Sequence, residues 1–261
     1  MTERRASTED YLDCISVANM RESDRLTIER FCSGRTLMYR AALGVYRAVQ
    51  REFGAASWGG NTVIAVGGGN NGGDGYALAC ILAGNGHSCR IVKLSEKLTE
   101  ESAYYAELAA GLGVPMETYA PGAFADCDTI VDCLLGTGFQ GSLREPWRSA
   151  VEEINVSGAR VISVDINSGM NGDTGEVETA VRSDLTVTIG FVKRGLVTEN
   201  AGRYMKRLVV ADIGIVLARQ EDKICASGET ELPSVAIVCP PWLQREPIDA
   251  RSADEQELEL A

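Results

Sequence analysis

Three segments in the middle of the chain carry the residue types that could do chemistry. The first, residues 67–75, reads GGGNNGGDG and follows a β-branched run at 62–66. Glycine tolerates positive φ and lets a ligand approach the backbone, and a helix that follows offers free N–H groups to an anion. The segment therefore predicts a cradle for phosphate groups. Its G-x-G-x-x-G spacing also fits a nicotinamide-dependent oxidoreductase, but Lys93 stands near the end of the next strand, where that fold uses an acid.

Asp74 places a carboxylate within this first segment. A carboxylate repels phosphate, so Asp74 either caps the following helix or accepts a hydrogen bond from a ligand hydroxyl. The sequence leaves both interpretations open.

The second segment, residues 136–141, reads GTGFQG and follows an apolar run at 129–135. Its glycines suit backbone donation to phosphate oxygens. Asp132 lies inside the apolar run, where an unpaired charge is very costly. It therefore needs a cation or several hydrogen-bond donors, and the pattern alone does not choose between them.

The third segment follows the run at 160–164 and begins with Asp165. The carboxyl end of a central strand is a ligand-binding position in doubly wound sheets. The chain has one histidine, so a carboxyl group is the obvious proton carrier, and Asp165 is the candidate; a turn-forming role is its alternative. Oxygen atoms of Asn71, Asp132 and Ser168 would together suit a hard cation, although their spacing does not separate sodium, potassium and magnesium.

Charge and cysteine content exclude several classes of partner. The formal net charge is −12, which opposes nucleic acid or an anionic membrane as the main partner. The eight cysteines form no C-x-x-C pair, so a zinc site is not indicated. No apolar run approaches the roughly 18 residues of a membrane span. We therefore expect reduced thiols, no membrane or nucleic-acid partner, and a cytoplasmic location.

Alternating strands and helices must position these segments. Apolar periodicity predicts helices over 20–31, 37–53, 76–83, 100–112 and 146–156, and strands over 62–66, 89–94, 116–119, 129–135, 160–166, 185–189 and 208–213. Such alternation is typical of an α/β fold with a single doubly wound, mostly parallel sheet and helices on both faces, a Rossmann-like architecture. Ligands of such sheets bind beyond the carboxyl ends of the strands, so the three segments should meet there.

The two ends of the chain differ in composition from its middle. Beyond residue 220, ten acids accompany only three bases and four of the seven prolines. We predict an N-terminal extension over 1–18, one domain over 19–216, and an acidic, proline-containing and poorly ordered tail over 217–261.

Four motifs occur in the same order as in a known family. They are GNNGGDG at 69–75, VDCLLGTG at 131–138, VDINSG at 164–169 and TIGFVKRG at 188–195. With Met20, Arg21 and Asp24 before them and VADIGI at 210–215 after them, the chain resembles the NAD(P)H-hydrate epimerase family, the YjeF N-terminal domain. The resemblance covers about residues 19–216.

The resemblance implies an isomerase of nicotinamide nucleotide repair. Such an enzyme interconverts the R and S epimers of NADHX and NADPHX, the hydrated forms of NADH and NADPH, and a separate dehydratase consumes the S epimer. It also implies a homodimer, one potassium ion per subunit, and a single activity in this chain. The implied substrate contacts are Asn70, Asn71, Gly72, Gly73, Asp74, Gly136, Thr137, Gly138, Phe139, Gln140, Gly141 and Asp165, with Asp165 as the catalytic residue and Asn71, Asp132 and Ser168 as potassium ligands.

The chain departs from the family pattern at Tyr39, Asn167, Val192 and Arg194. Asn167 replaces a proline, and loss of the fixed φ is expected to loosen the cation loop. Lys193 either meets a phosphate or is solvated, and we take the second as the expectation. Related domains also serve as interaction scaffolds without activity. This chain keeps both the carboxylate at 165 and the whole cation set, which favours the enzyme.

Overall fold

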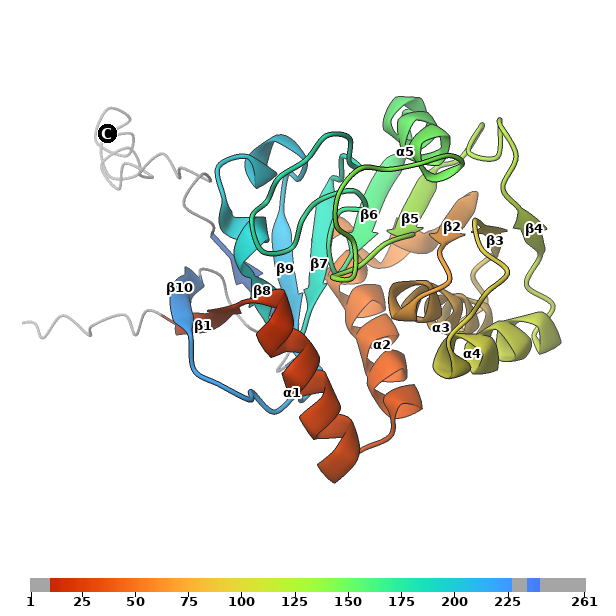
Figure 1. The fold of residues 1–261 in the computed structure, drawn as a ribbon. Coiled ribbons are helices and arrows are strands. Elements are labelled where there is room, and N and C mark those ends of the chain that lie inside the picture. Colours follow the sequence, from red (N-terminus) through yellow and green to blue (C-terminus); the bar gives the residue numbers. More distant parts are fainter. Residues whose placement is uncertain (1–9, 227–233, 240–261) are drawn as a thin grey trace, which may run out of the picture.

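An eleven-stranded sheet runs through the protein (Figure 1). The computed structural model describes residues 10–226 and 234–239. The larger part of the sheet is parallel and has the order β4-β3-β2-β5-β6-β7-β9. These strands are β2 (Thr62–Val66), β3 (Cys89–Lys93), β4 (Met116–Thr118), β5 (Thr129–Cys133), β6 (Arg160–Val164), β7 (Leu185–Ile189) and β9 (Leu208–Ala211).

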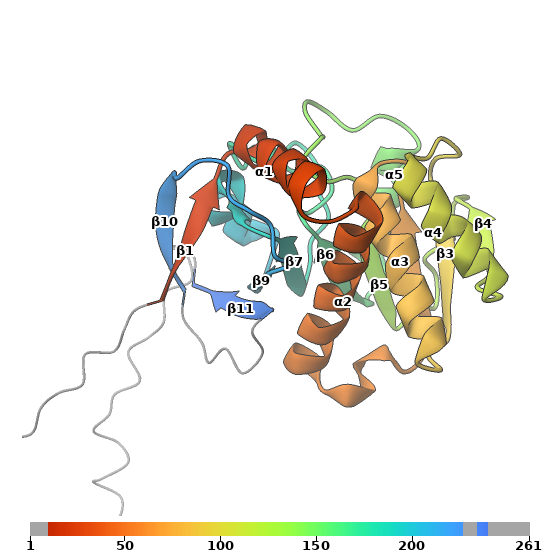
Figure 2. The same ribbon diagram turned by 90° about the horizontal axis from the view of Figure 1, so that it is seen from below.

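Helices cover both faces of these parallel strands (Figure 2). One face carries α2 (Gly34–Phe53), α3 (Asn70–Gly84) and α4 (Glu100–Gly111), and the other carries α5 (Trp147–Val156). Strand β2 serves both layers, because Ile64 and Val66 pack with α2 and α3 whereas Val63 and Ala65 pack with α5. A strand that is buried on both faces needs a continuous apolar run. The predicted doubly wound α/β fold is confirmed.

The strand order reverses between β2 and β5. After β2 the chain moves outward through β3 and β4, and it then returns to place β5, β6, β7 and β9 on the other side of β2. Ligands of such sheets bind beyond the carboxyl ends of the strands at this reversal. The loops after β2, β5 and β6 therefore lie at one end of three adjacent strands.

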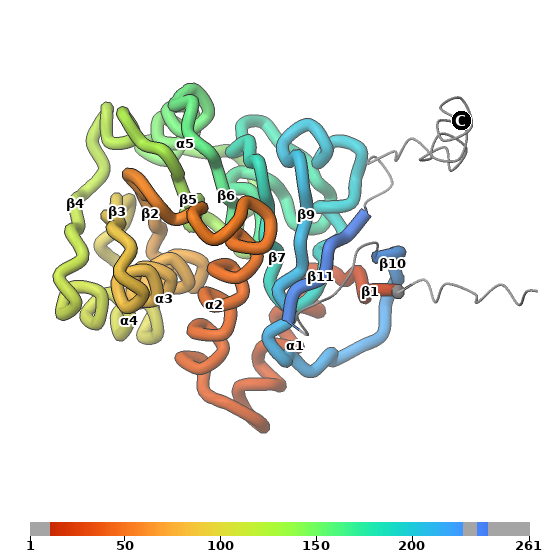
Figure 3. The backbone as a smooth tube through the Cα atoms, turned by 180° about the vertical axis from the view of Figure 1, so that it is seen from behind, coloured from red at the N-terminus to blue at the C-terminus, as the bar shows by residue number. Residues whose placement is uncertain are grey.

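Four further strands extend the sheet beyond β9 (Figure 3). They are β11 (Val235–Val238), β10 (Asp222–Ala226), β1 (Asp10–Ile15) and β8 (Val192–Lys193). Three of them lie in the segments that the sequence assigned to the N-terminal extension and the poorly ordered tail. The difference arises because the short apolar run of β11 pairs antiparallel with β9, from Val235 opposite Ala211 to Val238 opposite Leu208. Residues 1–9, 227–233 and 240–261 lie outside the described part of the chain.

Helix α1 (Val17–Arg30) connects β1 to the rest of the domain. Its N-cap is Ser16, whose hydroxyl accepts a hydrogen bond from the N–H of Asn19. The described residues also form the short 3-10 helices η1 (Ala55–Trp58), η2 (Arg194–Val197) and η3 (Ala201–Arg203). Within residues 10–226 and 234–239, no helix combines the length and apolar character needed to cross a membrane.

Candidate functional site

A cavity of about 820 Å³ lies at the carboxyl ends of β2, β5 and β6. The three loops that the sequence singled out all contribute to its wall, and α1 and α2 close it from the other side. The predicted substrate contacts found in this wall are Asn70, Asn71, Asp74, Gly136, Thr137, Gly138, Phe139, Gln140 and Asp165. The fold therefore brings together residues that lie almost a hundred positions apart in the chain.

Gly72, Gly73 and Gly141 lie outside the cavity wall. A Cβ atom on Gly72 would lie 2.0 Å from the carbonyl oxygen of Gly67, and one on Gly73 would lie 2.4 Å from Cε of Met38. The first two glycines therefore let the start of α3 pack closely against β2 and α2. Their observed role is packing, which in turn places the N-terminus of α3 at the cavity.

Helix α3 begins at Asn70, six residues earlier than the periodicity predicted. Gly69 is its N-cap and makes no side-chain capping bond. The N–H groups of the first turn lack partners within the helix, and Gly69, Asn70 and Asn71 line the cavity. This is an arrangement that attracts anions. Asp74 lies one turn inside the helix, so the interpretation of Asp74 as a helix cap is wrong.

Asp165 forms an ion pair with Lys193. The Lys193 side chain is fully buried, and its Nζ also donates to Oγ1 of Thr188 (3.1 Å) and to the carbonyl oxygen of Ile189 (2.7 Å). The expectation of a solvated Lys193 is wrong, because its side chain is buried and three acceptors surround the ammonium group. Asp165 has φ of 68°, an uncommon conformation outside glycine that asparagine and aspartate tolerate.

Three further acidic residues line the cavity: Asp24 from α1, Asp74 from α3 and Glu101 from α4. Burial raises the pKa of Asp24 to about 6, the charge of Lys193 opposes this rise, and that of Asp165 adds to it. Burial also raises the pKa of Asp74 well above its usual value, and the charges of Asp165 and Asp24 add to the effect. The carboxyl groups of Asp24, Asp74 and Asp165 thus come from three elements, and the charge of the buried Lys193 ammonium group acts on all three. Asp24 was not among the site residues predicted from the sequence.

The three predicted cation ligands form one connected group. Asp132 is fully buried, and its carboxylate accepts hydrogen bonds from the N–H of Leu134 (3.2 Å), the hydroxyls of Ser163 (2.9 Å) and Ser168 (2.5 Å), and the N–H of Ser168 (3.0 Å). Burial raises the pKa of Asp132, whereas the hydrogen bonds from Ser168, Ser163 and Leu134 oppose the rise. Several donors therefore satisfy this carboxylate, which was one of the two interpretations left open.

Asn71 completes this group through the backbone of Leu135. Its Nδ2 donates to the carbonyl oxygen of Leu135 (3.0 Å), and the N–H of Leu135 donates to Oγ of Ser168 (2.8 Å). Oδ1 of Asn71 is buried and has no hydrogen-bond partner. A buried amide oxygen without a donor is costly unless a cation or water meets it. The oxygen-only donor set and this unpartnered atom fit a hard cation.

Asn167 holds the cation loop in place. Its side chain is fully buried, and Nδ2 lies within 3.0 Å of the carbonyl oxygens of Val181 and Tyr204 and of Oγ of Ser183. Its Oδ1 accepts from Thr186 Oγ1 (2.6 Å). The effect of the missing proline on this loop stays a prediction; in the structure, hydrogen bonds to four residues hold the Asn167 side chain in place.

The other departures lie away from the cavity wall. Tyr39 is exposed, Val192 is buried among apolar side chains such as Ile166 and Leu196, and Arg194 forms ion pairs with Glu221 (3.0 Å) and Asp222 (3.4 Å). Arg194 thus connects the end of β8 to the segment that the sequence assigned to the tail. None of these three residues contacts the predicted cation ligands.

Comparisons with known proteins show to which family the chain belongs. The family model described as YjeF-related protein N-terminus matches residues 34–195. The NAD(P)H-hydrate epimerase of Limosilactobacillus fermentum is 35% identical over 202 residues, which are 76% of this chain and 95% of that protein. The bifunctional NAD(P)H-hydrate repair enzyme Nnr of Pyrobaculum aerophilum is 41% identical over 189 residues, and the match spans 69% of this chain and 37% of that relative.

A solved structure has the same fold. The crystal structure of the yeast protein ynu0 has a TM-score of 0.67 with 22% identity, and the match covers 81% of this chain and 97% of that chain. Together with the family model, which matches more than half of the chain, the sequence relatives establish the classification. The chain belongs to the family of YjeF-related N-terminal domains.

Proposed function

We propose that this chain is an NAD(P)H-hydrate epimerase that interconverts the R and S forms of NADHX and NADPHX. The observation that carries the proposal is the cavity at the strand reversal, where a helix N-terminus and the Asp165 carboxyl group line one wall. Relatives that carry this name are 35% identical over most of the chain, including one from Rhodopirellula baltica. The start of α3 attracts anions and suits the pyrophosphate of the substrate. With the pyrophosphate there, the nicotinamide ring would lie in the acidic part of the cavity.

The reaction requires proton transfer at one carbon of the hydrated ring. C6 bears a hydroxyl group and is bonded to the ring nitrogen, whose lone pair can expel the hydroxyl. Water then returns to the opposite face. A positioned carboxyl group that donates a proton on departure or accepts one on return contributes typically about a hundred- to ten-thousandfold in rate. Asp165 is this group in the proposal, and Lys193 holds its carboxylate in position.

The proposal includes a potassium ion held by Asn71, Asp132 and Ser168. The unpartnered Oδ1 of Asn71 and the connection of all three residues through Leu135 support it. A bound cation would balance the buried charge of Asp132 and tie the loops after β2, β5 and β6 together. Asn71 and Ser168 position the loops that line the cavity.

Thermal unfolding tests this cation site. A ligand that binds only the folded state stabilises it by RT ln(1 + [L]/Kd) and so raises the unfolding temperature as its concentration rises. Potassium chloride should therefore raise the unfolding temperature of the wild-type protein more than choline chloride at equal ionic strength, and Asn71→Ala should abolish the difference. Equal unfolding temperatures in the two salts would contradict the site.

The proposal also includes a partner activity and a homodimer. The chain spans 37% to 40% of the length of three bifunctional repair enzymes that it matches. A separate NAD(P)H-hydrate dehydratase would then consume the S epimer in the same repair process. Light scattering of the purified protein measures the number of subunits directly.

A chromatographic assay tests the proposed activity. Purified protein is incubated with the R epimer of NADPHX, and the S epimer is separated and quantified against a sample without protein. The expected result is S epimer at a rate far above the spontaneous one. Hydride transfer from NADPH in place of epimerisation would indicate an oxidoreductase, and neither reaction would indicate a binding scaffold.

A further inference from the structure

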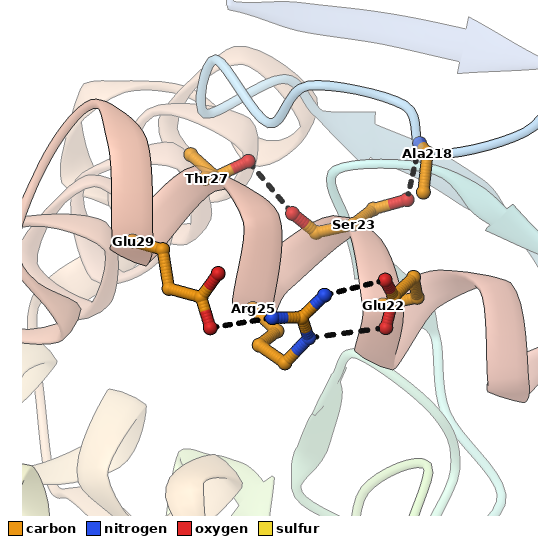
Figure 4. A network of polar contacts seen from close by, with 6 residues as sticks. All are labelled: Glu22, Ser23, Arg25, Thr27, Glu29 and Ala218. Atoms are coloured by element: carbon orange, nitrogen blue, oxygen red, sulfur yellow. Dashed lines mark hydrogen bonds and ion pairs between the residues drawn. The ribbon is translucent and has the colours of Figure 1, made fainter.

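Helix α1 presents two parallel stripes of side chains to the rest of the protein. Buried polar residues stand at every fourth position: Asn19, Ser23 and Thr27. They form hydrogen bonds with the backbone of the segment after β9. Asn19 Nδ2 donates to the carbonyl oxygen of residue 219 (2.8 Å). The N–H of residue 218 donates to Ser23 Oγ (3.0 Å), and the N–H of residue 216 donates to Thr27 Oγ1 (2.9 Å). Figure 4 shows the contact of Ser23 with Ala218.

The outer face of α1 is also defined. Arg25 forms ion pairs with Glu22 (2.7 Å) and Glu29 (2.5 Å) on the exposed side (Figure 4). The inner polar stripe and the outer charged face together fix the rotation of the helix about its axis. The adjacent stripe, offset by one residue from the polar one, consists of Met20, Asp24 and Ile28, and all three line the cavity.

Asp24 is therefore the polar member of an otherwise apolar stripe that closes the cavity. Within the described part of the chain its carboxyl group forms no hydrogen bond or ion pair, although it is half-buried. A half-buried carboxyl group without a partner is costly to keep in a fold. Residues with no internal partner that face a cavity are candidates to meet a ligand.

We propose that Asp24 is a second catalytic carboxyl group, which exchanges a proton with the C6 oxygen on the ring face opposite to the one served by Asp165. The proposal rests on the proposed epimerase function. Asp24 and Asp165 come from different elements, α1 and the loop after β6, and both line the same cavity. Inversion at C6 needs a proton donor where the hydroxyl departs and a proton acceptor where water arrives.

The step balances with these two groups. The protonated carboxyl group gives its proton to the departing hydroxyl, which leaves as water while the C6–O bond breaks and the ring nitrogen forms a double bond to C6. A second water adds to C6 from the other face, and the ionised carboxyl group takes its proton. One carboxyl group has then lost a proton and the other has gained one, and exchange with solvent restores the starting state.

The surroundings of Asp24 and Asp165 suit their roles as the two proton-exchanging carboxyl groups. The ammonium group of Lys193 forms an ion pair with Asp165 and holds its carboxyl group in place. Asp24 has a pKa of about 6, raised chiefly by burial, so it can both hold and release a proton near neutral pH. The pKa of Asp74 is raised well above its usual value, chiefly by burial, which suits a hydrogen-bond donor to the substrate better than a group that cycles.

Oxygen exchange tests this assignment. Each epimer of NADPHX is incubated in H₂¹⁸O with the wild-type protein, Asp24→Asn and, as a control, Glu29→Gln, which removes an exposed carboxylate from the same helix. Inversion is followed by chromatography and oxygen exchange at C6 by mass spectrometry. Binding of NADPH is measured for every variant, and Asp24→Ser replaces the asparagine variant if that one does not fold.

We expect Glu29→Gln to match the wild type. Asp24→Asn should bind NADPH normally and invert C6 about a hundredfold or more slowly. One epimer should still exchange its C6 oxygen without inversion, because Asp165 continues to serve one ring face, and a purely structural role would not produce this asymmetry. Inversion within threefold of the wild-type rate would overturn the assignment of Asp24. Loss of NADPH binding together with loss of oxygen exchange from both epimers would also overturn it. A wild-type protein that neither inverts nor exchanges would instead remove the proposed function.

Discussion

Replacing Lys193 by methionine tests whether the buried ammonium group stabilises the fold mainly through its ion pair with Asp165. Methionine keeps an unbranched side chain of similar length, so Lys193→Met removes the charge with little change in packed volume. The substitution leaves Asp165 with one weak partner, the N–H of Ile189 at 3.4 Å. It also removes the donor to the carbonyl oxygen of Ile189 and to Thr188 Oγ1.

The size of the effect follows from the burial of the pair. Removing one partner of a buried ion pair costs about 3 to 5 kcal/mol. The Asp165 side chain keeps 14% of its surface exposed, so water partly compensates and we expect the lower end, about 3 kcal/mol. The Asp165→Asn variant has no carboxylate that would be left without a partner. In that background the loss of stability caused by Lys193→Met should be smaller by about 2 kcal/mol.

Urea unfolding of four proteins gives this coupling energy: the wild type, the two single variants and the double variant. The free energy of unfolding is obtained from the midpoint and slope of each transition at neutral pH. An equal cost of Lys193→Met in both backgrounds, within about 0.5 kcal/mol, would refute the reasoning, because independent sites add to that accuracy. Lys193 would then stabilise the loop through Thr188 and Ile189 alone.

Three further predictions concern stability. Asn167→Ala strands the groups that bond Asn167 and should lower the free energy of unfolding by about 3 kcal/mol in urea titrations; a loss below about 1 kcal/mol would contradict its role. Gly72→Ala should lower the unfolding temperature far more than Gly84→Ala in the same helix. A Cβ atom at position 72 would clash with the backbone, whereas one at position 84 would have no atom within 4 Å. Equal shifts of the unfolding temperature would contradict the packing role of Gly72. Since the pKa of Asp24 is raised by burial to about 6 in the folded state, Asp24→Asn should gain stability relative to the wild type as pH rises from about 4, the ordinary value, to about 6, and a pH-independent difference in unfolding midpoints would contradict it.

The fold could be predicted from local patterns. Each central strand is an apolar, β-branched run, and the helices between them show regular apolar spacing, which indicates parallel crossover units. Convergence of the three loops then follows from topology, because parallel strands end at the same edge. The added strands could not be predicted in this way. Val235–Val238 is too short to distinguish from any apolar stretch until its pairing with β9 is known.

The site residues that the sequence missed depend on contacts between distant elements. Lysine is normally solvated, and burial of Lys193 becomes favourable through its contacts with Asp165, Thr188 and Ile189, which the fold brings together. Asp24 did carry a signal, since it stands four residues from both Met20 and Ile28, in line with an apolar stripe. The replacement of proline by Asn167 could be seen in the sequence. Its four hydrogen-bonded partners could not be predicted, because they come from segments that follow it in the chain.

Epimerisation by Asp165→Asn tests the central claim most directly. Asparagine tolerates the φ of 68° at this position and nearly preserves the shape of the side chain, but it carries no exchangeable carboxyl proton. With NADPH binding as the measure of an intact cavity, we predict that the variant binds like the wild type while kcat for conversion of the R to the S epimer falls by about a hundredfold or more. Unchanged kcat in a variant that folds and binds would contradict the account.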